Sequence, residues 1–510
     1  MSFNKKIPAL QRSQEFSLLA NPSRRNMLKT LGTIAVVAPG MFTLGGCETL
    51  LEAIRTRPTR RDLATLAPND PIIETYRAAV AAMKALPASD PRNWNQQAEI
   101  HFNFCPHSNW FFLPWHRAYL LYFEQICREL TREKSFALPY WNWTCNRTLP
   151  ESFLNNGTNP LFQPGRTGNP PAALPDDIVG PPVMDAILDE SNFLIFGSSP
   201  AAGQRDFAGY GPLEGTPHNF VHGFVGGVMS SFRSPRDPIF WMHHNMIERV
   251  WWEWNVVRGF ANTNDPAWTN FEFNANFVDR NGNSVDTSVG AMLLAPLLSY
   301  RFDDSPITSC GPVIGRRTRG EMDRSALRRL LKEGAPTSLR PLRTFVGEGA
   351  VDVPVGTAAS QVLRVRDPAV SADIPLGPDV RVLLRAIDVR QPPDEDFFVR
   401  VFINLPSANG DTPTSDPHFA GSFAFFVDPA HTADGTFLVD ATATLQRLRG
   451  LDRIRSGGEV SVQLVAVPMP EQRQPRQLRQ TRLSLRAVEL QLVQSMAAAP
   501  QSLGGTSPKK

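Results

Sequence analysis

Long apolar runs, internal repeats and blocks of basic residues are all missing from this sequence. No stretch of Lys and Arg would follow a nucleic-acid backbone, so a nucleic-acid partner is not expected. The apolar run at residues 31–44 is too short, and too rich in Gly and Pro, to span a bilayer as a stable helix. A net charge of +3, with 42% hydrophobic and 20% charged residues, is typical of a soluble globular protein of two or three domains.

Histidine is also scarce, and its distribution is uneven. Only nine of the 510 residues are histidine. Seven of them lie between positions 101 and 244: His101, His107, His116, His218, His222, His243 and His244. Histidines used for ordinary packing would be scattered along the chain. Clustering of this kind indicates a shared role, and the usual shared role is metal ligation.

The first fifty residues have the pattern of a targeting segment. Arg24 and Arg25 precede a short apolar stretch, in the manner of a twin-arginine export signal. The run "LGGC" ending at Cys47 resembles a bacterial lipoprotein cleavage box, so Cys47 is a candidate membrane tether. We therefore expect residues 1–50 to be an export signal, and the protein to be periplasmic or in the cell envelope.

Five cysteines are present: Cys47, Cys105, Cys127, Cys145 and Cys310. An oxidising compartment would permit a disulfide among the last three. The sequence does not choose the pair, and buried free thiols are equally compatible with it.

The composition divides the rest of the chain into segments of different character. Residues 51–310 are rich in aromatics and in helical periodicity, with helices expected at Pro71–Leu86, Ala118–Leu130 and Asn245–Val257. Residues 311–344 are charged and indicate a linker with one short helix. Residues 345–494 contain short alternating runs such as "FFVRVFINL", which are typical of an antiparallel β-sandwich. Residues 495–510 are expected to be disordered. The predicted fold is a mainly α domain followed by a β-sandwich domain.

The histidines fall into two groups of three. His218 and His222 are four residues apart, so on a helix they share one face, and His244 follows on another predicted helix. The first group is His101, His107 and His116. Two imidazole triads with little cysteine or carboxylate nearby favour copper, with zinc second. Two alternatives stay open: His243 could be the ligand in place of its neighbour, and His101 could cap a helix.

Several stretches resemble the tyrosinase and polyphenol oxidase family of type-3 dicopper proteins, over roughly residues 55–310. "HSNWFFLPWHRAYLLYFE" is similar to the copper A stretch of that family, and "QQAEIH" to the segment that supplies its first ligand. "PHNFVH" and "RDPIFWMHHN" resemble the copper B stretches. The resemblance implies that His101, His107 and His116 bind one copper ion. It implies that His218, His222 and His244 bind the other, with His243 outside the ligand set.

The resemblance also implies an activity. Family members use two copper ions and O2 to oxidise catechols to o-quinones, and some first hydroxylate monophenols in the ortho position. Cys105 stands two residues before His107, a spacing similar to that of the cysteine–histidine thioether found in fungal and molluscan members. Glu214 and Asn219 resemble a pair that orders a water beside the substrate. Ser231 occupies a position where plant relatives often carry a phenylalanine, so it is expected to leave the substrate entrance open.

The C-terminal runs "FFVRVFINLPS" and "DPHFAGSFAFF" resemble the domain that keeps plant polyphenol oxidases latent. There a β-sandwich covers the active site until it is removed, and Phe419 is the candidate here for the residue that plugs the site. "SYRFDD" at Ser299–Asp304 resembles the motif that closes the catalytic domain, and is expected beside the arginines of residues 57–63. The alternatives are a haemocyanin-like reversible oxygen carrier and a zinc-bound or metal-free structural relative.

Overall fold

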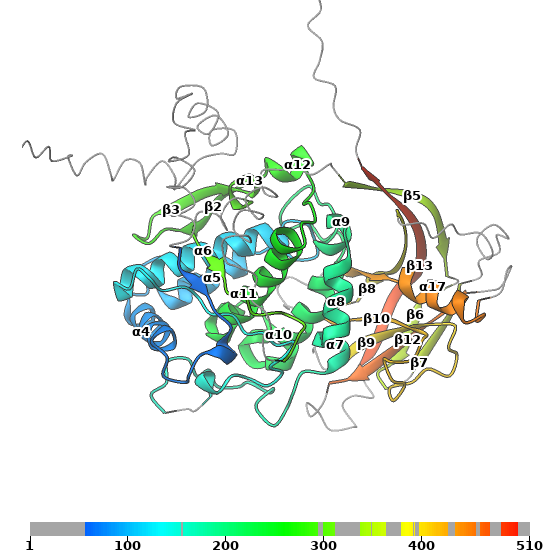
Figure 1. Cartoon of the computed structure of the whole chain (residues 1–510), viewed down its shortest axis with the longest axis horizontal. Helices are drawn as coiled ribbons and strands as arrows, with labels where there is room; N and C mark the ends of the chain where they lie inside the picture. The colour runs from blue at the N-terminus through cyan, green and yellow to red at the C-terminus, as the bar shows by residue number, and fades with distance from the viewer. Residues whose placement is uncertain are drawn as a thin grey trace, which may run out of the picture.

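The computed structural model describes most of the chain between residues 57 and 497. The described ranges are 57–154, 157–293, 299–311, 337–347, 349–356, 358–363, 379–390, 392, 397–426, 434–454, 460–469 and 481–497. The predicted export signal with Cys47, the predicted linker helix and most of the predicted tail lie outside these ranges. Helices gather in one part of the molecule and a pair of sheets in the other (Figure 1).

The helical region is built around one long buried helix, α6. Its main helices are α4 (Pro71–Ala85), α5 (Trp94–Phe104), α6 (Phe112–Thr131), α10 (Asn219–Val225) and α11 (Ile239–Trp252), the last continued by the π-helical turn η6 (Glu253–Val257). Helices α4 and α11 both contact α6. All three helices expected from periodicity are present. Within the described ranges, no helix combines the length and apolar character needed to cross a membrane.

Local sequence explains where these helices start. The Asp70 side chain accepts a hydrogen bond from the backbone N–H of Ile72, and Pro71 occupies the first helical position of α4. Asn93 caps α5 in the same way, through the N–H of Asn95. The cap at Asn93 sets the start of the helix that carries His101, so it also sets the position of that histidine.

Between α6 and α11 the chain forms short elements. They are η2 (Glu151–Phe153), α7 (Asp176–Val179), α8 (Pro181–Asp189), α9 (Phe193–Phe196), the π-helical turn η3 (Glu214–His218), and the 3-10 turns η4 (Gly227–Ser230) and η5 (Ser234–Arg236). After α11 come α12 (Pro266–Thr269), a hairpin of β2 (Glu272–Val278) and β3 (Ser284–Ser288), and α13 (Val289–Met292). The periodicity analysis did not anticipate this hairpin. Turn η3 runs directly into α10, and this continuity brings His218 and His222 to one side.

The start and end of the helical region are joined, as the "SYRFDD" motif predicts. Strand β1 (Thr59–Arg60) pairs in parallel with β4 (Arg301–Phe302). The Arg60 guanidinium lies 3.5 Å from the centre of the Tyr300 ring and donates to Glu124 at 2.9 Å. Tyr300 in turn donates its hydroxyl to Glu248 at 2.6 Å. A buried guanidinium is costly unless it is paired, so this network fixes the ends of the region in a definite register.

The structure selects one of the open cysteine pairings. Cys145 and Cys310 form a disulfide, with their Cα atoms 5.1 Å apart. Cys127 is not part of this bond and is buried in α6. The disulfide therefore attaches the end of the helical region, near residue 310, to the loop that follows α6.

The C-terminal region consists of two antiparallel sheets. One has the strand order β10-β9-β12-β7; in the other, the order is β11-β8-β13-β5, with β6 also paired to β13. The strands are β5 (Thr337–Val346), β6 (Val351–Pro354), β7 (Ala358–Leu363), β8 (Val380–Val389), β9 (Phe397–Ile403), β10 (Phe419–Phe423), β11 (Gly435–Asp440), β12 (Val460–Pro468) and β13 (Arg482–Ala497), with helix α17 (Thr442–Gly450). Strand β5 begins inside the segment expected to be a linker, and β13 extends three residues past the expected boundary at 494.

Residues from both sheets share one hydrophobic core. Val382 and Leu384 of β8 belong to the same buried cluster as Val399 of β9 and Leu464 of β12. Alternation along each strand places these side chains on one face, as the short alternating runs predict. Burial of this aliphatic face gives the C-terminal region a core separate from that of the helices.

The second sheet and the end of β10 lie against the helical region. Tyr210 forms an isolated bridge with Phe437 of β11, and the two rings stack at 4.6 Å. Arg400 of β9 donates to Asp177 of α7 at 2.7 Å, and both side chains are largely buried. These contacts hold the residues that follow β10 beside turn η3.

Candidate metal centre

The structure brings all six predicted ligands to one place, although they come from six different segments. His101 lies on α5, His107 on the loop before α6, and His116 on α6. His218 ends η3, His222 lies on α10, and His244 lies on α11. Every one of these side chains is buried, with at most 3% of its surface exposed.

The first triad converges through ring nitrogens. Nε2 of His101 and Nε2 of His116 are 3.3 Å apart. The ring of His107 lies 5.6 Å from each of the other two rings. Ring nitrogens of His101, His116 and His244, one from each, lie within 4.8 Å of one another. A ring nitrogen of His107 lies within the same distance of His101 and of the Cys105 sulfur, so His101 belongs to both groups.

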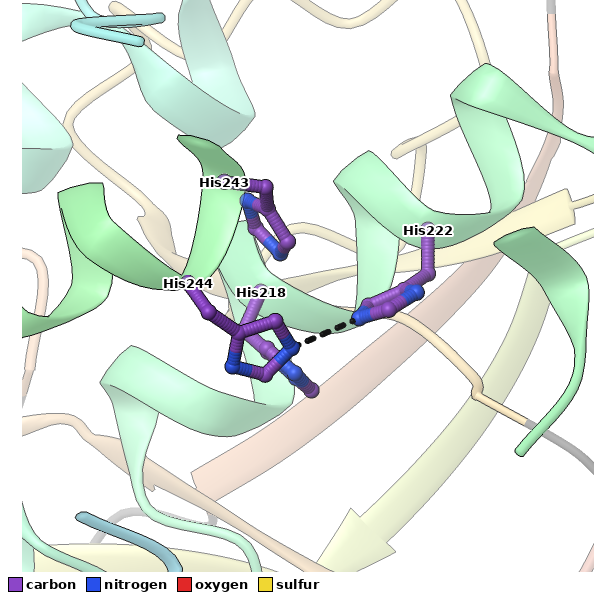
Figure 2. A group of neighbouring side chains, drawn as sticks. All are labelled: His218, His222, His243 and His244. Atoms are coloured by element: carbon purple, nitrogen blue, oxygen red, sulfur yellow. Dashed lines mark hydrogen bonds between the residues drawn. The ribbon is translucent and has the colours of Figure 1, made fainter. Parts of the chain in front are cut away.

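The second triad has the same character. Nε2 of His222 lies 3.2 Å from Nε2 of His244, and the His218 ring lies 4.7 Å from that of His222 (Figure 2). The ring nitrogens of these three residues and of His243 lie within 4.8 Å of one another. The spacing of His218 and His222 by four residues does place both on one side of the helical segment, as predicted.

The two triads adjoin each other. The rings of His107 and His218 stack at 5.6 Å, and those of His116 and His244 stack at 4.4 Å. Two ions bound in the two triads would therefore be neighbours, close enough to share one small molecule.

Backbone carbonyls orient three of the six ligands. Nδ1 of His101 lies 2.7 Å from the carbonyl oxygen of Phe232, and Nδ1 of His116 lies 2.8 Å from that of Phe112. Nδ1 of His222 lies 2.8 Å from the carbonyl oxygen of Met229. A carbonyl can only accept, so each of these Nδ1 atoms carries the proton and each Nε2 keeps its lone pair.

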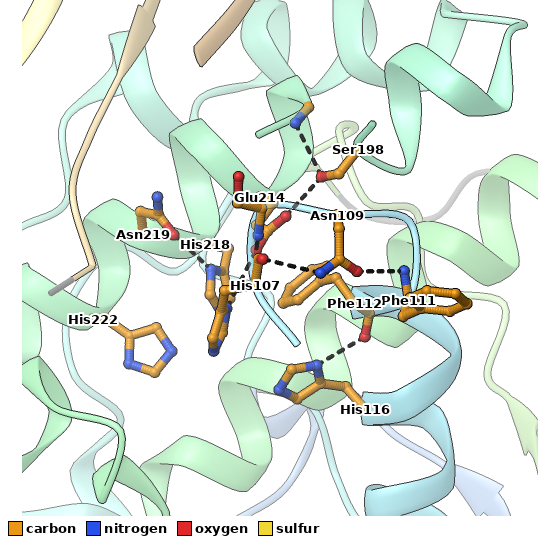
Figure 3. A network of polar contacts seen from close by, with 12 residues as sticks. His107, Asn109, Phe111, Phe112, His116, Ser198, Glu214, His218, Asn219 and His222 are labelled. Atoms are coloured by element: carbon orange, nitrogen blue, oxygen red, sulfur yellow. Dashed lines mark hydrogen bonds and ion pairs between the residues drawn. The ribbon is translucent and has the colours of Figure 1, made fainter. Parts of the chain in front are cut away.

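Side chains orient two more. Nδ1 of His107 lies 3.2 Å from Oε1 of Glu214, and Nδ1 of His218 lies 2.9 Å from Oδ1 of Asn219 (Figure 3). The Nε2 atoms of both rings are buried and have no hydrogen-bond partner. The predicted catalytic residues Glu214 and Asn219 thus contact one histidine of each triad.

Burial controls the charge of the site. It lowers the pKa of His101 and of His218 to about 3, and hydrogen bonds to these rings offset only part of that effect. The pKa values of His107, His116, His222 and His244 are also lowered, first by burial and then by neighbouring imidazoles. At neutral pH the rings are uncharged, as metal ligands must be.

Glu214 is perturbed in the opposite direction. Burial raises the pKa of its carboxyl to about 8, while hydrogen bonds from Ser198 and Ser108 lower it. The hydroxyl of Ser198 donates to Oε2 at 2.6 Å, and the backbone N–H of Ser108 donates to Oε1 at 2.7 Å. Ser198 was not expected from the sequence, because sixteen residues separate it from Glu214.

Two further groups stand beside the triads. Cys105 ends α5, is buried, and has its sulfur within 4.8 Å of ring nitrogens of His101 and His107. The thioether to His107 remains a prediction. His243 is buried and neither of its ring nitrogens has a hydrogen-bond partner, so it adds a fourth imidazole to the second group (Figure 2).

Aromatic rings surround the histidines, and one of them comes from the C-terminal region. The ring of Phe426 lies 4.1 Å from that of His222 and 5.0 Å from that of His107. Phe419 lies elsewhere: it is partly buried and packs on Phe402 at 5.6 Å. The residue that reaches the site is therefore Phe426, and not the candidate named from the sequence. Phe425 and Phe426 are adjacent, and in an extended segment adjacent side chains point to opposite sides, so only one of the two rings can face the histidines.

The predicted entrance residue, Ser231, is partly exposed. Its hydroxyl donates to the carbonyl of Val228 at 3.0 Å and accepts from the N–H of Arg233. The aromatic ring at this edge belongs to Phe232, which lies 5.0 Å from the His107 ring and 5.2 Å from Phe426. Phe232 was not singled out from the sequence.

Residues 80–181 and 180–257 match the common central domain of tyrosinase. Over these residues the chain is similar to the tyrosinase family. It is 30% identical over 292 residues to polyphenol oxidase A1 of Vicia faba, a match that covers 48% of either chain, so it spans about half the length of that relative. It is 26% identical to the tyrosinase HcTyr1 of Hahella sp. (strain CCB-MM4), over 84% of this chain and 98% of that one.

The fold of the whole described molecule has a solved counterpart. The structure of latent apple tyrosinase superimposes with a TM-score of 0.64, at 23% identity, over 86% of this chain and 97% of that one. The tyrosinase family is a binuclear copper family, and the site agrees with that cofactor. Its donors are neutral imidazoles, the preferred ligands of copper, and buried Nε2 atoms without partners face the space between the rings. The six histidines therefore fit a pair of copper ions.

Proposed function

We propose that this protein oxidises phenols with O2 to o-quinones at a pair of copper ions. The observation that carries the proposal is the convergence of six buried imidazoles, three of them oriented by backbone carbonyls, in a site lined by aromatic rings. His101, His107 and His116 would hold copper A; His218, His222 and His244 would hold copper B. When bound, the two ions supply the redox chemistry with O2.

The protein's own part is to bind, orient and keep the site dry. Five of the six rings have an acceptor beside Nδ1, which leaves Nε2 of each available for copper; Nδ1 of His244 is buried without a partner. The Phe426 ring packs against that of His222, with centroids 4.1 Å apart and the planes tilted by 34°, in the position where a phenol ring of the same size would lie. The phenylalanine side chain thus marks the expected substrate position, with Phe232 as a neighbouring wall.

We extend the proposal to monophenols. Glu214 and Asn219 flank η3, and their side chains contact the two stacked histidines, His107 and His218. A water held between the pair would accept the phenol proton as the substrate binds. In the packed protein the Asn219 amide nitrogen donates to the carbonyl of Ala424 at 2.9 Å, so removal of the C-terminal region would free that amide for water.

Latency follows from the same contacts. We propose that the two C-terminal sheets are a β-sandwich that shields the site, and that Phe426 is its plug. The carbonyl of Gly215 accepts from Ala424 at 2.7 Å, and the hydroxyl of Thr216 donates to Ser422 at 2.5 Å. The plug is therefore anchored to the turn that carries His218, next to the copper B ligands.

Two further parts of the proposal concern covalent chemistry. A thioether between Cys105 and His107 would fix the one copper A ligand that no helix carries. Loss of two hydrogen masses from the tryptic peptide holding both residues would establish it, and an unchanged, alkylatable thiol would refute it. With a serine at 231, the substrate entrance would stay wider than with a phenylalanine.

We also propose export through residues 1–50, with Cys47 as a lipid-bearing tether. The Cys145–Cys310 disulfide supports an oxidising compartment. Replacing Arg24 and Arg25 by lysines should leave the protein in the cytoplasm on cell fractionation. Replacing Cys47 by alanine should release it from the membrane fraction; membrane-free wild-type protein would remove the tether from the proposal.

Quinone formation by the copper-loaded protein tests the main proposal. Catechol and tyrosine would each be assayed before and after limited proteolysis between residues 311 and 345, with metal-free protein as control. We expect catechol turnover that rises on cutting, and tyrosine turnover after it. Two bound coppers with reversible O2 uptake and no turnover in either state would leave an oxygen carrier instead.

A further inference from the structure

His107 differs from the other ligands in how its ring is held. It lies on the loop between α5 and α6, so no helix fixes its direction, and its Nδ1 faces a carboxyl group rather than a backbone carbonyl. A backbone carbonyl is already fixed by the chain, whereas the carboxyl of Glu214 is at the end of a flexible side chain. The Glu214 carboxyl can orient the His107 ring only if another group fixes the direction of that carboxyl.

The hydroxyl of Ser198 is that group. It donates to Oε2 of Glu214 at 2.6 Å and accepts from the backbone N–H of Gly211 at 3.0 Å (Figure 3). Because an amide N–H can only donate, the hydroxyl proton of Ser198 is directed to the carboxyl. All of these side chains are buried, with 1% of Ser198 and 1% of Glu214 exposed.

The backbone around Ser198 is arranged for this contact. Ser198 has φ +71°, a left-handed conformation that is uncommon for any residue except glycine. A side-chain carbon at Gly211 would come within 2.4 Å of the Ile195 carbonyl oxygen, so only glycine can bring its N–H to the Ser198 hydroxyl. Ser108, whose N–H donates to the other oxygen of Glu214, also has a positive φ, of +61°.

We infer that Ser198 is a positioning residue for copper A. Its hydroxyl fixes the Glu214 carboxyl as an acceptor for the Nδ1–H of His107, which leaves Nε2 of that ring as the copper ligand. The chain of contacts runs from Gly211 through Ser198 and Glu214 to His107, and it reaches only one of the two triads. This inference rests on the proposed copper site, but copper binding can be measured apart from turnover.

Ser198→Ala removes the hydroxyl, and Ser108→Ala is its matched control. Ser108 is equally buried and has the same backbone conformation, but its hydroxyl has no hydrogen-bond partner, and only its N–H reaches Glu214. Both variants would be dialysed against a series of chelator concentrations, and the copper retained per chain would be counted. Loss of a group that orients a metal ligand typically weakens binding by about 10- to 100-fold.

We expect Ser198→Ala to lose one copper per chain at a chelator concentration at which wild type and Ser108→Ala keep two. Equal retention by the two variants would overturn the inference. So would loss of both coppers together from Ser198→Ala, since that would indicate general destabilisation. A wild-type protein that binds no copper would overturn the proposed function, and this inference with it.

Two further variants separate the hydroxyl from the backbone. Ser198→Gly suits a φ of +71° without strain, so it should fold as well as wild type and still lose one copper. Two coppers retained by Ser198→Gly would show that the hydroxyl is not needed. In a Glu214→Ala background, which removes both the contact to Ser198 and the contact to His107, Ser198→Ala should weaken copper binding no further, because the two residues act in series. An additional loss of the same size in that background would contradict the inference.

Discussion

The helical region and the C-terminal sheets bury different kinds of residue. The helical core holds the polar side chains of Arg60, Arg117, Glu124 and Glu248 together with most of the tryptophans. The shared core of the sheets is mainly Val, Leu, Ile and Phe. Buried charges are costly unless each is paired, so they limit the conformations a region can adopt. The region that must place six imidazoles is built from directional contacts, and the region that must cover them is built from non-directional ones.

Removing a ligand should have the largest effect, and the effect should be confined to one region. We expect His222→Ala to lose copper and to show no detectable turnover, because its Nε2 lies within the second triad, 3.2 Å from that of His244. Copper content and catechol oxidation by the cut protein would measure this. His418→Ala is the control: this buried histidine of the C-terminal region contacts the Ile403 carbonyl and Arg453, far along the chain from the triads. It should keep both coppers.

Stability should also separate the two regions. Arg117 is held by two contacts to Glu248, at 3.0 and 2.9 Å, and its guanidinium lies 3.5 Å from the Trp251 ring. Arg117→Ala leaves Glu248 buried without the guanidinium that pairs with it, and should destabilise the helical region by about 3–5 kcal/mol. Leu464→Ala, in the sheet core, should cost about 2–5 kcal/mol through the cavity it leaves.

Copper distinguishes the two unfolding events, because a bound ion stabilises only the region that holds it. Calorimetry should show that Arg117→Ala lowers the transition that copper raises, and that Leu464→Ala lowers the one that copper leaves unchanged. A single transition, shifted by both substitutions, would mean that the two regions unfold as one unit. The difference between their cores would then not give them separate stabilities.

The same contrast explains what the sequence could reveal. The histidines that converge could be named from the sequence because histidine is rare here and because His218, His222 and His244 lie in short, recognisable patterns. The partners that orient these ligands were not. Ser198 meets Glu214 through a left-handed turn, and Phe426 meets His222 across some two hundred residues of chain. Such contacts depend on how segments pack, which local patterns do not encode.

Alternating strand patterns and the "SYRFDD" motif predicted the structure in part. Alternation identified the C-terminal strands, but it placed the start of the region at 345, whereas β5 begins at Thr337 within a charged segment. The resemblance of "SYRFDD" correctly placed Tyr300 beside Arg60. For the plug, the sequence offered the right segment and the wrong phenylalanine, because the choice depends on which side of the chain faces the copper site.

Opening the plug should raise activity by a smaller factor than ligand loss lowers it. In the uncut protein, Phe426→Ala removes the ring that packs against His222, so the fraction of molecules with an accessible site increases. We expect catechol turnover to rise on the order of tenfold. This corresponds to a loss of about 1.4 kcal/mol from the free energy that favours the closed site. Phe419→Ala, which alters packing on Phe402 instead, should leave uncut turnover unchanged. A rise with Phe419→Ala and none with Phe426→Ala would reverse the assignment.

The smallest effect concerns pH and the boundary between the two regions. Glu190 of the helical region lies beside Asp440 and Arg381 of the sheets, with Nε of Arg381 3.5 Å from its Oε2. Burial, and then the charge of Asp440, raises the Glu190 pKa from 4.5 to about 7. A carboxyl with a raised pKa favours the packed state while it is protonated. Its contribution is therefore complete below about pH 4.5 and is lost as pH rises to about 7.

We accordingly expect the shield to loosen as pH rises from 5 to 8. The ratio of catechol turnover in uncut to cut protein should increase over this range, by less than the roughly tenfold rise expected when the plug itself is opened. Cut protein serves as the reference at each pH, so changes in the chemistry itself cancel. Glu190→Gln, which stays neutral at every pH, should flatten the ratio. A ratio that rises equally in this variant would place the pH sensitivity of the shield in another group.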